Sequence, residues 1–350
     1  MFEESAAAVH NDHLFGLPFS VKESEIVIIP VPWEVTVSFR PGTANGPEAI
    51  REASYQIDLY DPPFATGDQW KQGFAMERIN EVTRNEGRRL RAIAEHCIRF
   101  QEQGVLPGNQ AFLHAQQEVN QGCELLNSWV KEKSFAYLQG QKLVGIVGGD
   151  HSVPLGLMQA LAEYHGSYGI LHIDAHYDQR DAFEGFKFSH ASIMRNASRI
   201  EAVEKIVHVG IRDYCKEEAN YVAQSPKKFI TFTDWNLACD EFIHTMSPWL
   251  KTCDNIIGSL PERVYISFDI DGLDPSLCPH TGTPVPGGLS FQQVSFLLLQ
   301  LLESGRRIIG FDLCEVAPGS NDFARDWDAN VGARILYRLC SLLTESSLSM

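Results

Sequence analysis

Short apolar runs recur along the chain and alternate with amphipathic stretches. The apolar runs predict strands at 25–31, 142–147, 168–173, 205–210, 228–233, 263–269 and 307–313. Several of them are apolar at both odd and even positions, which is typical of parallel strands that are covered on both faces. Amphipathic stretches at 152–165, 291–304 and 328–345 predict helices. This alternation predicts a three-layer αβα fold with a mostly parallel sheet.

Residues 60–130 interrupt this rhythm. Two helical patterns, at 86–100 and 111–133, follow one another and are joined by the turn sequence "GVLPGNQ". We interpret the segment at about 60–130 as a helical insertion, and not as a separate domain. The chain, 1–350, is therefore expected to form a single domain.

Ionisable residues cluster where the predicted strands end. "GGDHS" follows the strand at 142–147, "DAHYD" follows 168–173, "DID" begins at the last residue of 263–269, and "CEVAP" follows 307–313. Ligands of parallel α/β sheets bind outside the carboxyl ends of the strands. The sequence therefore predicts a functional site at this edge of the sheet.

Three of these motifs predict a metal site. Alternate residues of an extended segment point to one side, so acids and histidines two positions apart can converge. Mixed carboxylate and imidazole ligands suit Mn²⁺ and neighbouring first-row metals. Each motif alone has a plain explanation, such as a glycine turn or a pair of loop acids, but the three together favour metal binding. The candidate ligands are His151, Asp174, His176, Asp178, Asp269 and Asp271. Six ligands are too many for a single metal ion that must also bind a water molecule. His172 precedes this pattern, and we interpret it as a hydrogen-bonded core histidine.

Composition narrows the class of partner. The formal net charge of −16 argues against nucleic-acid binding and fits poorly with an anionic membrane surface, whereas a cationic substrate is compatible. The eight cysteines form no C-x-x-C pair, which favours reduced thiols in a cytoplasmic protein. The N-terminus lacks the features of a secretory signal, and no apolar run approaches the roughly 18 residues of a membrane span.

The motifs resemble those of the ureohydrolase family, which comprises arginases, agmatinases and their relatives. "GGDHS", "DAHYD", "SFDIDGLDPSLCPHTGTPVPGGLS" and "EVAP" occur in the family's order and spacing, and "FRPGTANGPEAIR" resembles its N-terminal glycine loop. The resemblance implies an arginase-like fold, two Mn²⁺ ions per chain, and hydrolysis of a guanidinium group to urea and an amine. It also implies a homo-oligomer, a trimer or a hexamer.

The resemblance implies a role for each site residue. One metal would be held by His151, Asp174, Asp178 and Asp269, and the other by His176, Asp174, Asp269 and Asp271. Glu315 corresponds to the glutamate that grips the guanidinium, and His190 to the histidine that moves protons. Where the family usually has His-Gly, this chain has His190-Ala191.

The sequence leaves alternatives for the substrate's tail, the part of the molecule that carries the guanidinium group. "EGFKFSH" and the loop after "DID" favour agmatine, which would be cleaved to putrescine and urea. Asp213 would hold a cationic amine, or else is a turn acid. Arg180 would pair with a substrate carboxylate, or else with Asp181 or Glu184. The first alternative for Arg180 would indicate an arginase or a guanidino-acid hydrolase such as one for guanidinobutyrate, or a formiminoglutamase.

Two hypotheses that assign the chain to a different class of protein remain open at this point. One is an acyl-lysine deacetylase of the same fold, which would hold a single zinc ion with fewer ligands. The other is an inactive metal-binding homologue. All six ligand positions, His190 and Glu315 are present, and this completeness favours the binuclear hydrolase.

Overall fold

The computed structural model of the protein describes residues 9–61, 68–104, 110–243 and 248–348. Its centre is one eight-stranded sheet with the order β2-β1-β3-β8-β7-β4-β5-β6, in which every pair of neighbours is parallel. The strands are β1 (Ile26–Val31), β2 (Phe74–Met76), β3 (Leu143–Gly148), β4 (Tyr168–Ile173), β5 (Val203–Ile211), β6 (Phe229–Thr233), β7 (Arg263–Asp269) and β8 (Arg307–Cys314).

The seven predicted strands are confirmed, with ends shifted by at most two residues. The short strand β2, which lies within the segment 60–130, was not predicted. β2 has three residues and pairs only with β1, at the edge of the sheet. A three-residue strand is too short to show an alternating pattern.

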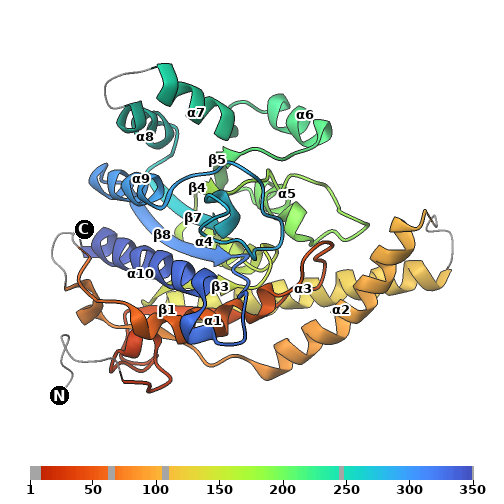
Figure 1. The fold of residues 1–350 in the computed structure, drawn as a ribbon, viewed down its shortest axis with the longest axis horizontal. Helices are drawn as coiled ribbons and strands as arrows, with labels where there is room; N and C mark the ends of the chain where they lie inside the picture. The colour runs from red at the N-terminus through yellow and green to blue at the C-terminus, as the bar shows by residue number, and fades with distance from the viewer. Residues whose placement is uncertain (1–8, 62–67, 105–109, 244–247, 349–350) are drawn as a thin grey trace.

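Helices cover both faces of the sheet (Figure 1). Side chains of α1, α7, α8, α9 and α10 pack with one face, and side chains of α2 to α6 pack with the other. Neighbouring residues of β1 divide between the two cores, since Ile28 lies in the first and Ile29 in the second. The three-layer αβα fold is therefore confirmed. The helices are α1 (Gly46–Ala53), α2 (Glu81–Glu102), α3 (Gln110–Gln139), α4 (Leu155–His165), α5 (Ile193–Ser198), α6 (Lys216–Gln224), α7 (Asp234–Ile243), α8 (Pro248–Gly258), α9 (Phe291–Glu303) and α10 (Trp327–Leu348).

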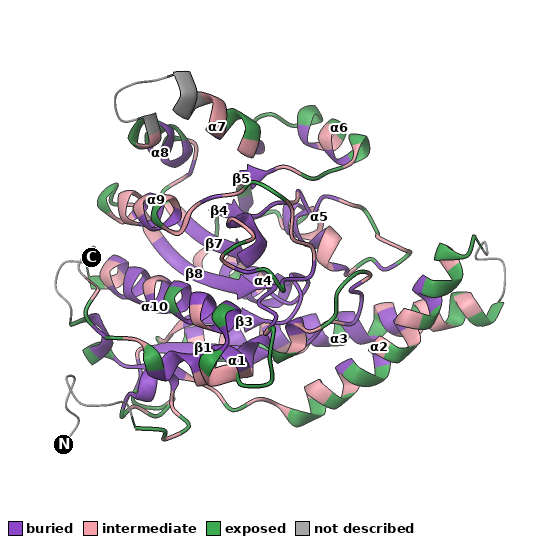
Figure 2. Cartoon of the chain, viewed as in Figure 1, coloured by how far each residue is buried: buried purple, intermediate pink, exposed green. Residues whose placement is uncertain are grey.

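The predicted helices at 86–100 and 111–133 form α2 and α3, a long pair that extends beyond the sheet (Figure 1). Along the part near the sheet, Leu90 and Val130 are buried in the second core. Gly122 of α3 lies against Leu90, where a Cβ atom would come within 2.2 Å of Cδ1, so the glycine permits close packing of the two helices. The far ends are mostly exposed or half-buried (Figure 2).

Two further properties expected from the sequence can be compared with the fold. All eight cysteines are free thiols, as predicted. Among the described residues, no helix combines the length and the apolar character that crossing a membrane requires.

Candidate metal centre and its cavity

The six candidate ligands come from the ends of three central strands. His151 lies in the turn after β3, Asp174 follows β4, and Asp269 ends β7. The turn before His151 requires a glycine, since a Cβ atom at Gly149 would lie 1.9 Å from the carbonyl oxygen of Trp33. Strands β3, β8, β7 and β4 are consecutive in the sheet, so their carboxyl ends bring these residues together.

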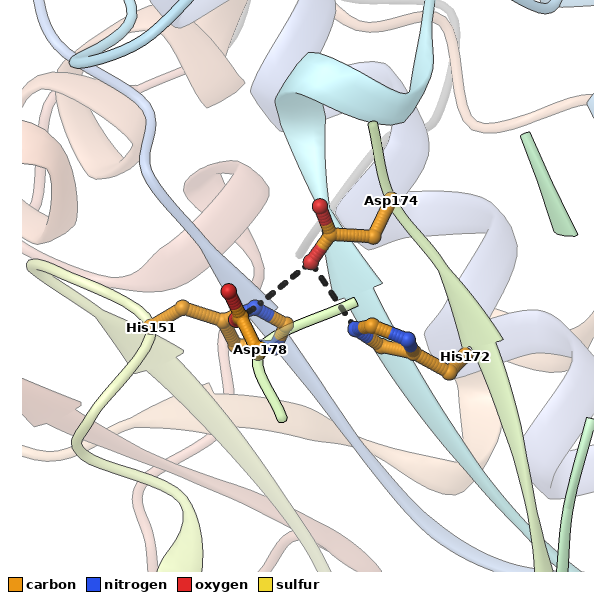
Figure 3. A group of neighbouring side chains, drawn as sticks. All are labelled: His151, His172, Asp174 and Asp178. Atoms are coloured by element: carbon orange, nitrogen blue, oxygen red, sulfur yellow. Dashed lines mark hydrogen bonds and ion pairs between the residues drawn. The ribbon is translucent and has the colours of Figure 1, made fainter. Parts of the chain in front are cut away.

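His151 faces three carboxylates. Its Nδ1 atom lies 3.1 Å from Oδ2 of Asp174 and 3.3 Å from Oδ2 of both Asp178 and Asp269. Figure 3 shows Asp174, Asp178 and the histidine side chains turned toward one another. An imidazole offers at most one hydrogen at Nδ1, which cannot satisfy three carboxylates. The arrangement leaves buried negative charge without a partner of its own.

A second group adjoins the first. Nδ1 of His176 lies 3.4 Å from Oδ1 of Asp174 and 3.1 Å from Oδ2 of Asp271. The two oxygens of Asp174 therefore face different histidines. Asp271 is held in place because its Oδ1 accepts a hydrogen bond from the Ala175 backbone at 3.0 Å, and its own backbone N–H donates to Oδ1 of Asp269. Asp174 and Asp269 thus connect the two groups.

Burial makes this concentration of charge costly. All four aspartates are at most 6% exposed. Burial, followed by the neighbouring Asp174 carboxylate, raises the pKa of Asp178 to about 6. Burial and the carboxylates of Asp271 and Asp174 raise the pKa of Asp269 well above its usual value. Cations between the carboxylates would remove this penalty, so the donor set fits divalent metal ions.

The side chain of His151 is oriented from behind by residues that sequence reasoning missed. Its Nε2 atom lies 2.9 Å from Oγ of Ser267 and 3.4 Å from Oδ1 of Asp312. Ser267 in turn donates a hydrogen bond of 2.8 Å to Asp312. Such supporting contacts fix the ring orientation of a metal-binding histidine. Ser267 lies two residues before Asp269, in the same phase of β7, which is the one signal that the sequence offered.

His172 is a buried, hydrogen-bonded core histidine, as predicted. Its Nδ1 atom lies 2.8 Å from Nδ1 of His208 in β5. Its Nε2 atom lies 2.8 Å from Oδ2 of Asp174. His172 therefore also orients a carboxylate of the cluster.

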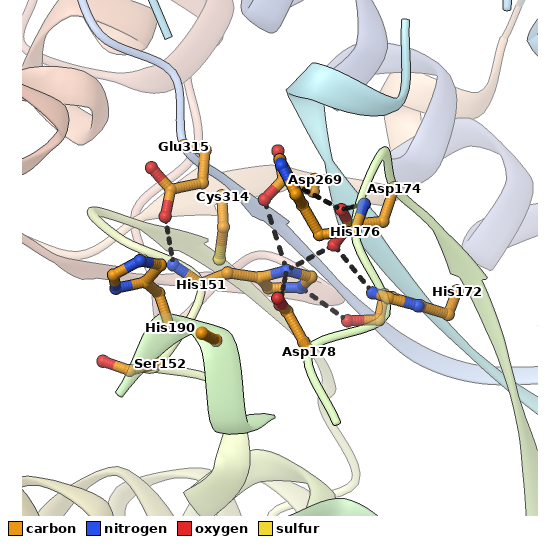
Figure 4. A network of polar contacts seen from close by, with 12 residues as sticks. His151, Ser152, His172, Asp174, His176, Asp178, His190, Asp269, Cys314 and Glu315 are labelled. Carbon is orange, nitrogen blue, oxygen red and sulfur yellow. Dashed lines mark hydrogen bonds and ion pairs between the residues drawn. The ribbon is translucent and has the colours of Figure 1, made fainter. Parts of the chain in front are cut away.

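Glu315 points into the same site from the end of β8 (Figure 4). Its Oε1 atom accepts a hydrogen bond of 2.9 Å from the His151 backbone, and its own backbone N–H donates to Gly149. Burial, with the nearby Asp150 carboxylate, raises the pKa of Glu315 well above its usual value. The backbone at Glu315 and Asp178 has φ of 64° and 52°, values that non-glycine residues rarely adopt. Strain at two residues of one site is typical of a functional centre.

His190 lies on the other side of the cavity, at the start of a short 3₁₀ turn that Ser189 caps. Ala191, which stands where the family usually has glycine, is part of this turn and has no positive φ. Burial and the imidazoles of His176 and His151 lower the pKa of His190 to about 3. The ring is therefore neutral at neutral pH.

A cavity of about 380 Å³ brings these residues together. Its lining includes all the predicted catalytic and substrate residues and several of the predicted ligands. It is lined by Ser38, His151, His176, Asp178, Arg180, Phe183, His190, Ala191, Asp213, Tyr214, Cys215, Glu218, Asp269, Thr283 and Glu315.

The chain matches the family model described as "Arginase family" over residues 24–341. The chain belongs to the arginase family. Among curated relatives, the N(1)-aminopropylagmatine ureohydrolase of Thermus thermophilus is 30% identical over 297 residues, covering 85% of this chain and 84% of that protein. The agmatinase of Halalkalibacterium halodurans is 29% identical over 298 residues, covering 85% of each chain.

A solved structure supports the fold of this arginase-family chain. The agmatine ureohydrolase of Thermoplasma volcanium superposes with a TM-score of 0.68, at 21% identity, over 95% of this chain and 94% of that one. The resemblance seen in the sequence motifs is thus confirmed, as is the arginase-like α/β fold. Family and relatives also confirm the reaction class, a hydrolase acting on carbon–nitrogen bonds of amidines.

One expectation about the cavity is wrong. Arg180 does not pair with Asp181 or Glu184. Its Nε atom lies 3.7 Å from Oε2 of Glu218. Asp181 instead pairs with Arg199 and Arg195. The Arg180 side chain lines the cavity, whereas Asp181 is exposed.

Glu218 was missed by sequence reasoning. It is 4% exposed and caps α6, since its side chain accepts hydrogen bonds of 3.1 Å from the backbones of Cys215 and Gln179. The capping-box spacing, with a glutamate three residues after the cap, was visible in "CKEE". Asp213 lies at the cavity mouth with a side chain that is 69% exposed, and its Oδ2 atom is 3.9 Å from Nε2 of His176.

Proposed function

We propose that this chain binds two divalent metal ions, Mn²⁺ in the native enzyme, and hydrolyses the guanidinium group of agmatine to urea and putrescine. One ion would be held by His151, Asp174, Asp178 and Asp269, and the other by His176, Asp174, Asp269 and Asp271. The approach of three carboxylates to one imidazole nitrogen supports this assignment. When bound, a pair of divalent ions supplies a water molecule that is nucleophilic near neutral pH.

Glu315 binds the guanidinium. Its Oε1 atom is occupied by the His151 backbone, and its Oε2 atom faces Gly282, where a Cβ atom would come within 3.0 Å. The missing side chain at Gly282 leaves Oε2 open toward a ligand. A carboxylate that pairs with a guanidinium forms charge-assisted hydrogen bonds in a fixed plane. Glu315 therefore sets the orientation of the planar substrate group.

His190 transfers a proton. The carbon–nitrogen bond to the amine breaks only when the leaving nitrogen takes up a proton, because an amide anion is a very poor leaving group. A neutral imidazole that faces the cavity can accept a proton released when water adds, and can return it to the leaving nitrogen.

The observation that carries the choice of substrate is the pairing of Arg180 with Glu218. The buried Glu218 carboxylate offsets the guanidinium charge of Arg180, so that Asp213 determines the net charge at this end of the cavity. A negative charge there attracts the terminal ammonium of agmatine. The names of the relatives, agmatinase and N(1)-aminopropylagmatine ureohydrolase, support an amine tail.

A second candidate is a guanidino-acid hydrolase. Arg180 lines the cavity, and one guanidinium can bind Glu218 and a substrate carboxylate at the same time through different nitrogens. Guanidinobutyrate, arginine and formiminoglutamate all present such a carboxylate.

The decisive experiment is a urea assay with Mn²⁺-loaded protein on agmatine, N(1)-aminopropylagmatine, arginine and guanidinobutyrate, with an ammonia assay on formiminoglutamate. We expect the two amines to be the best substrates. A clear preference for guanidinobutyrate or arginine would refute the amine assignment. The matched control is Glu315→Gln, which keeps the shape of the side chain and should abolish urea release while the protein retains its metals.

Metal stoichiometry tests the remaining alternatives. Two ions per chain are expected, and a single zinc ion would favour a deacetylase. The assembly into a trimer or hexamer and the cytoplasmic location stay predictions, which light scattering and cell fractionation address.

A further inference from the structure

The turn at 183–186 contributes Phe183 to the lining of the cavity. The backbones of Phe183 and Phe186 exchange hydrogen bonds of 3.1 and 2.9 Å, and the two residues between them, Glu184 and Gly185, have φ of 53° and 83°. Two consecutive positive φ values are typical of a type I′ turn. The ring of Phe183 lies 6.0 Å from the ring of His190, and the guanidinium of Arg180 lies 5.0 Å from the centre of Phe183. The turn therefore bears directly on the side chains that line the cavity.

Three side-chain amides from the far ends of α2 and α3 hold the tip of this turn from outside. Gln101 and Gln116 each donate a hydrogen bond to the carbonyl of Glu184, at 2.9 and 3.1 Å. Asn120 makes two contacts, since its Nδ2 donates to Gly185 at 3.1 Å and its Oδ1 accepts from the Lys187 backbone at 2.7 Å. The side-chain amide of Asn120 thus donates one hydrogen bond to the loop backbone and accepts one from it, as a paired strand would.

The fit between helices and turn is close. A Cβ atom at Gly185 would come within 1.5 Å of Nε2 of Gln116, so the helix side chain occupies the space that only a glycine leaves free. Without these contacts, the carbonyls of the tip would face only solvent and the turn would depend on its two internal hydrogen bonds. An isolated two-residue hairpin is only marginally stable in water.

We propose that Gln101, Gln116 and Asn120 form an amide clamp through which the α2–α3 pair positions Phe183 and Arg180 against the tail of the substrate. This inference rests on the proposed function. The three clamp residues are positioning residues and do not touch the substrate. The clamp connects the far ends of α2 and α3 to a turn that contributes Phe183 to the cavity lining.

The test uses the full-length, metal-loaded protein with the double variant Gln116→Leu/Asn120→Leu. Hydrogen exchange reports the clamp directly, because the Lys187 amide donates to Asn120. We expect exchange in the peptide around 183–187 to rise about tenfold, because the variant loses the hydrogen bonds of Gln116 and Asn120 to this segment. KM should rise about three- to tenfold, and kcat should change less than about threefold, because the candidate ligands lie on other segments. The matched control is Gln117→Leu/Gln121→Leu, at two exposed positions of the same helix.

Each result decides the proposal. Unchanged exchange around the turn would overturn the clamp, and raised exchange with unchanged KM would overturn its role in substrate binding. A fall in kcat at constant KM would assign the clamp to His190 and overturn the tail assignment. Kinetics should use whichever guanidino compound the wild type cleaves. A wild type that cleaves none would refute the proposed function and the tail assignment with it, whereas the exchange measurement still decides whether the clamp holds the turn.

Discussion

Arg180 and Glu218 form an ion pair inside the substrate cavity, with Nε 3.7 Å from Oε2, although they lie on different segments of the chain. The Arg180 side chain is 37% exposed and that of Glu218 only 6%. Two backbone N–H groups hold the Glu218 carboxylate in place, so the Arg180 side chain is the partner that is free to change its position. Each residue has a predictable effect on the choice of substrate.

Replacing Glu218 by glutamine should weaken the binding of agmatine. The variant would keep the shape of the side chain and leave the charge of Arg180 uncompensated beside the substrate's ammonium group. We expect KM for agmatine to rise about tenfold, which corresponds to roughly 1.4 kcal/mol. Steady-state kinetics at two salt concentrations would measure this, since screening reduces a charge effect.

The companion variant Arg180→Leu should keep agmatine hydrolysis within about threefold of wild type, because partly exposed ion pairs contribute roughly 0–1 kcal/mol. Any activity on guanidinobutyrate should fall much further. If agmatine turnover collapsed in Arg180→Leu while guanidinobutyrate turnover persisted, Arg180 would have to act in some way other than through its charge.

Asp269→Ala should lose metal as well as activity. Asp269 faces His151 through Oδ2 at 3.3 Å and accepts the Asp271 backbone through Oδ1, so it contributes to both halves of the cluster. Elemental analysis after dialysis should show fewer than two ions per chain. Finding two tightly bound ions in this variant would exclude Asp269 as a shared ligand. The exposed Asp213 offers a control, since Asp213→Ala should keep its metals.

The candidate ligands could be predicted from sequence because each belongs to a short motif at the end of a strand. The spacing of Asp174 and Asp178 just after β4 predicted that they converge, and parallel strands bring their carboxyl ends to one edge. In the structure both follow β4, and Asp178 has φ of 52° rather than an extended backbone. The contact between Arg180 and Glu218 could not be predicted in this way. It joins a loop to the first turn of α6, and the relative position of these two segments depends on how the whole chain folds.

The same reasoning applies to the helices. The amphipathic patterns of α2 and α3 were sufficient to predict their existence. Their contacts with the turn at 184–185 depend on the position in space of two half-buried side-chain amides, those of Gln116 and Asn120, which the helical pattern does not determine. Strand β2 was missed for a different reason, because three residues at a sheet edge carry no periodic signal.

His190→Ala should lower kcat while leaving the metal content intact. General acid–base groups typically contribute about 10²–10⁴-fold to the rate. Because the pKa of His190 is about 3 in the free protein, the loss should be present throughout the neutral pH range. Single-turnover kinetics between pH 6 and 9 would measure it. An unchanged kcat would assign proton transfer to another group.

Glu184→Gln should change how stability depends on pH. Oε2 of Glu184 is buried without a hydrogen-bond partner in the described part of the chain. Burial and the nearby Glu102 carboxylate raise the pKa of Glu184 from 4.5 to about 7, although the charge of Arg91 acts in the opposite direction. Between pH 4.5 and about 7, Glu184 is protonated in the folded protein but ionised in the unfolded chain. The free energy of unfolding therefore falls as the pH rises through this range.

Glutamine resembles the protonated acid and removes that loss. We therefore expect Glu184→Gln to match wild type in stability near pH 4.5 and to exceed it above pH 7. Glu184 is only half-buried, so solvent screening reduces the effect to roughly 1 kcal/mol. Thermal unfolding of both proteins at pH 5 and pH 8 would measure it, with Glu124→Gln on the exposed side of α3 as the control. If the difference between variant and wild type were the same at both pH values, the carboxyl of Glu184 would titrate normally and the turn would not bury it.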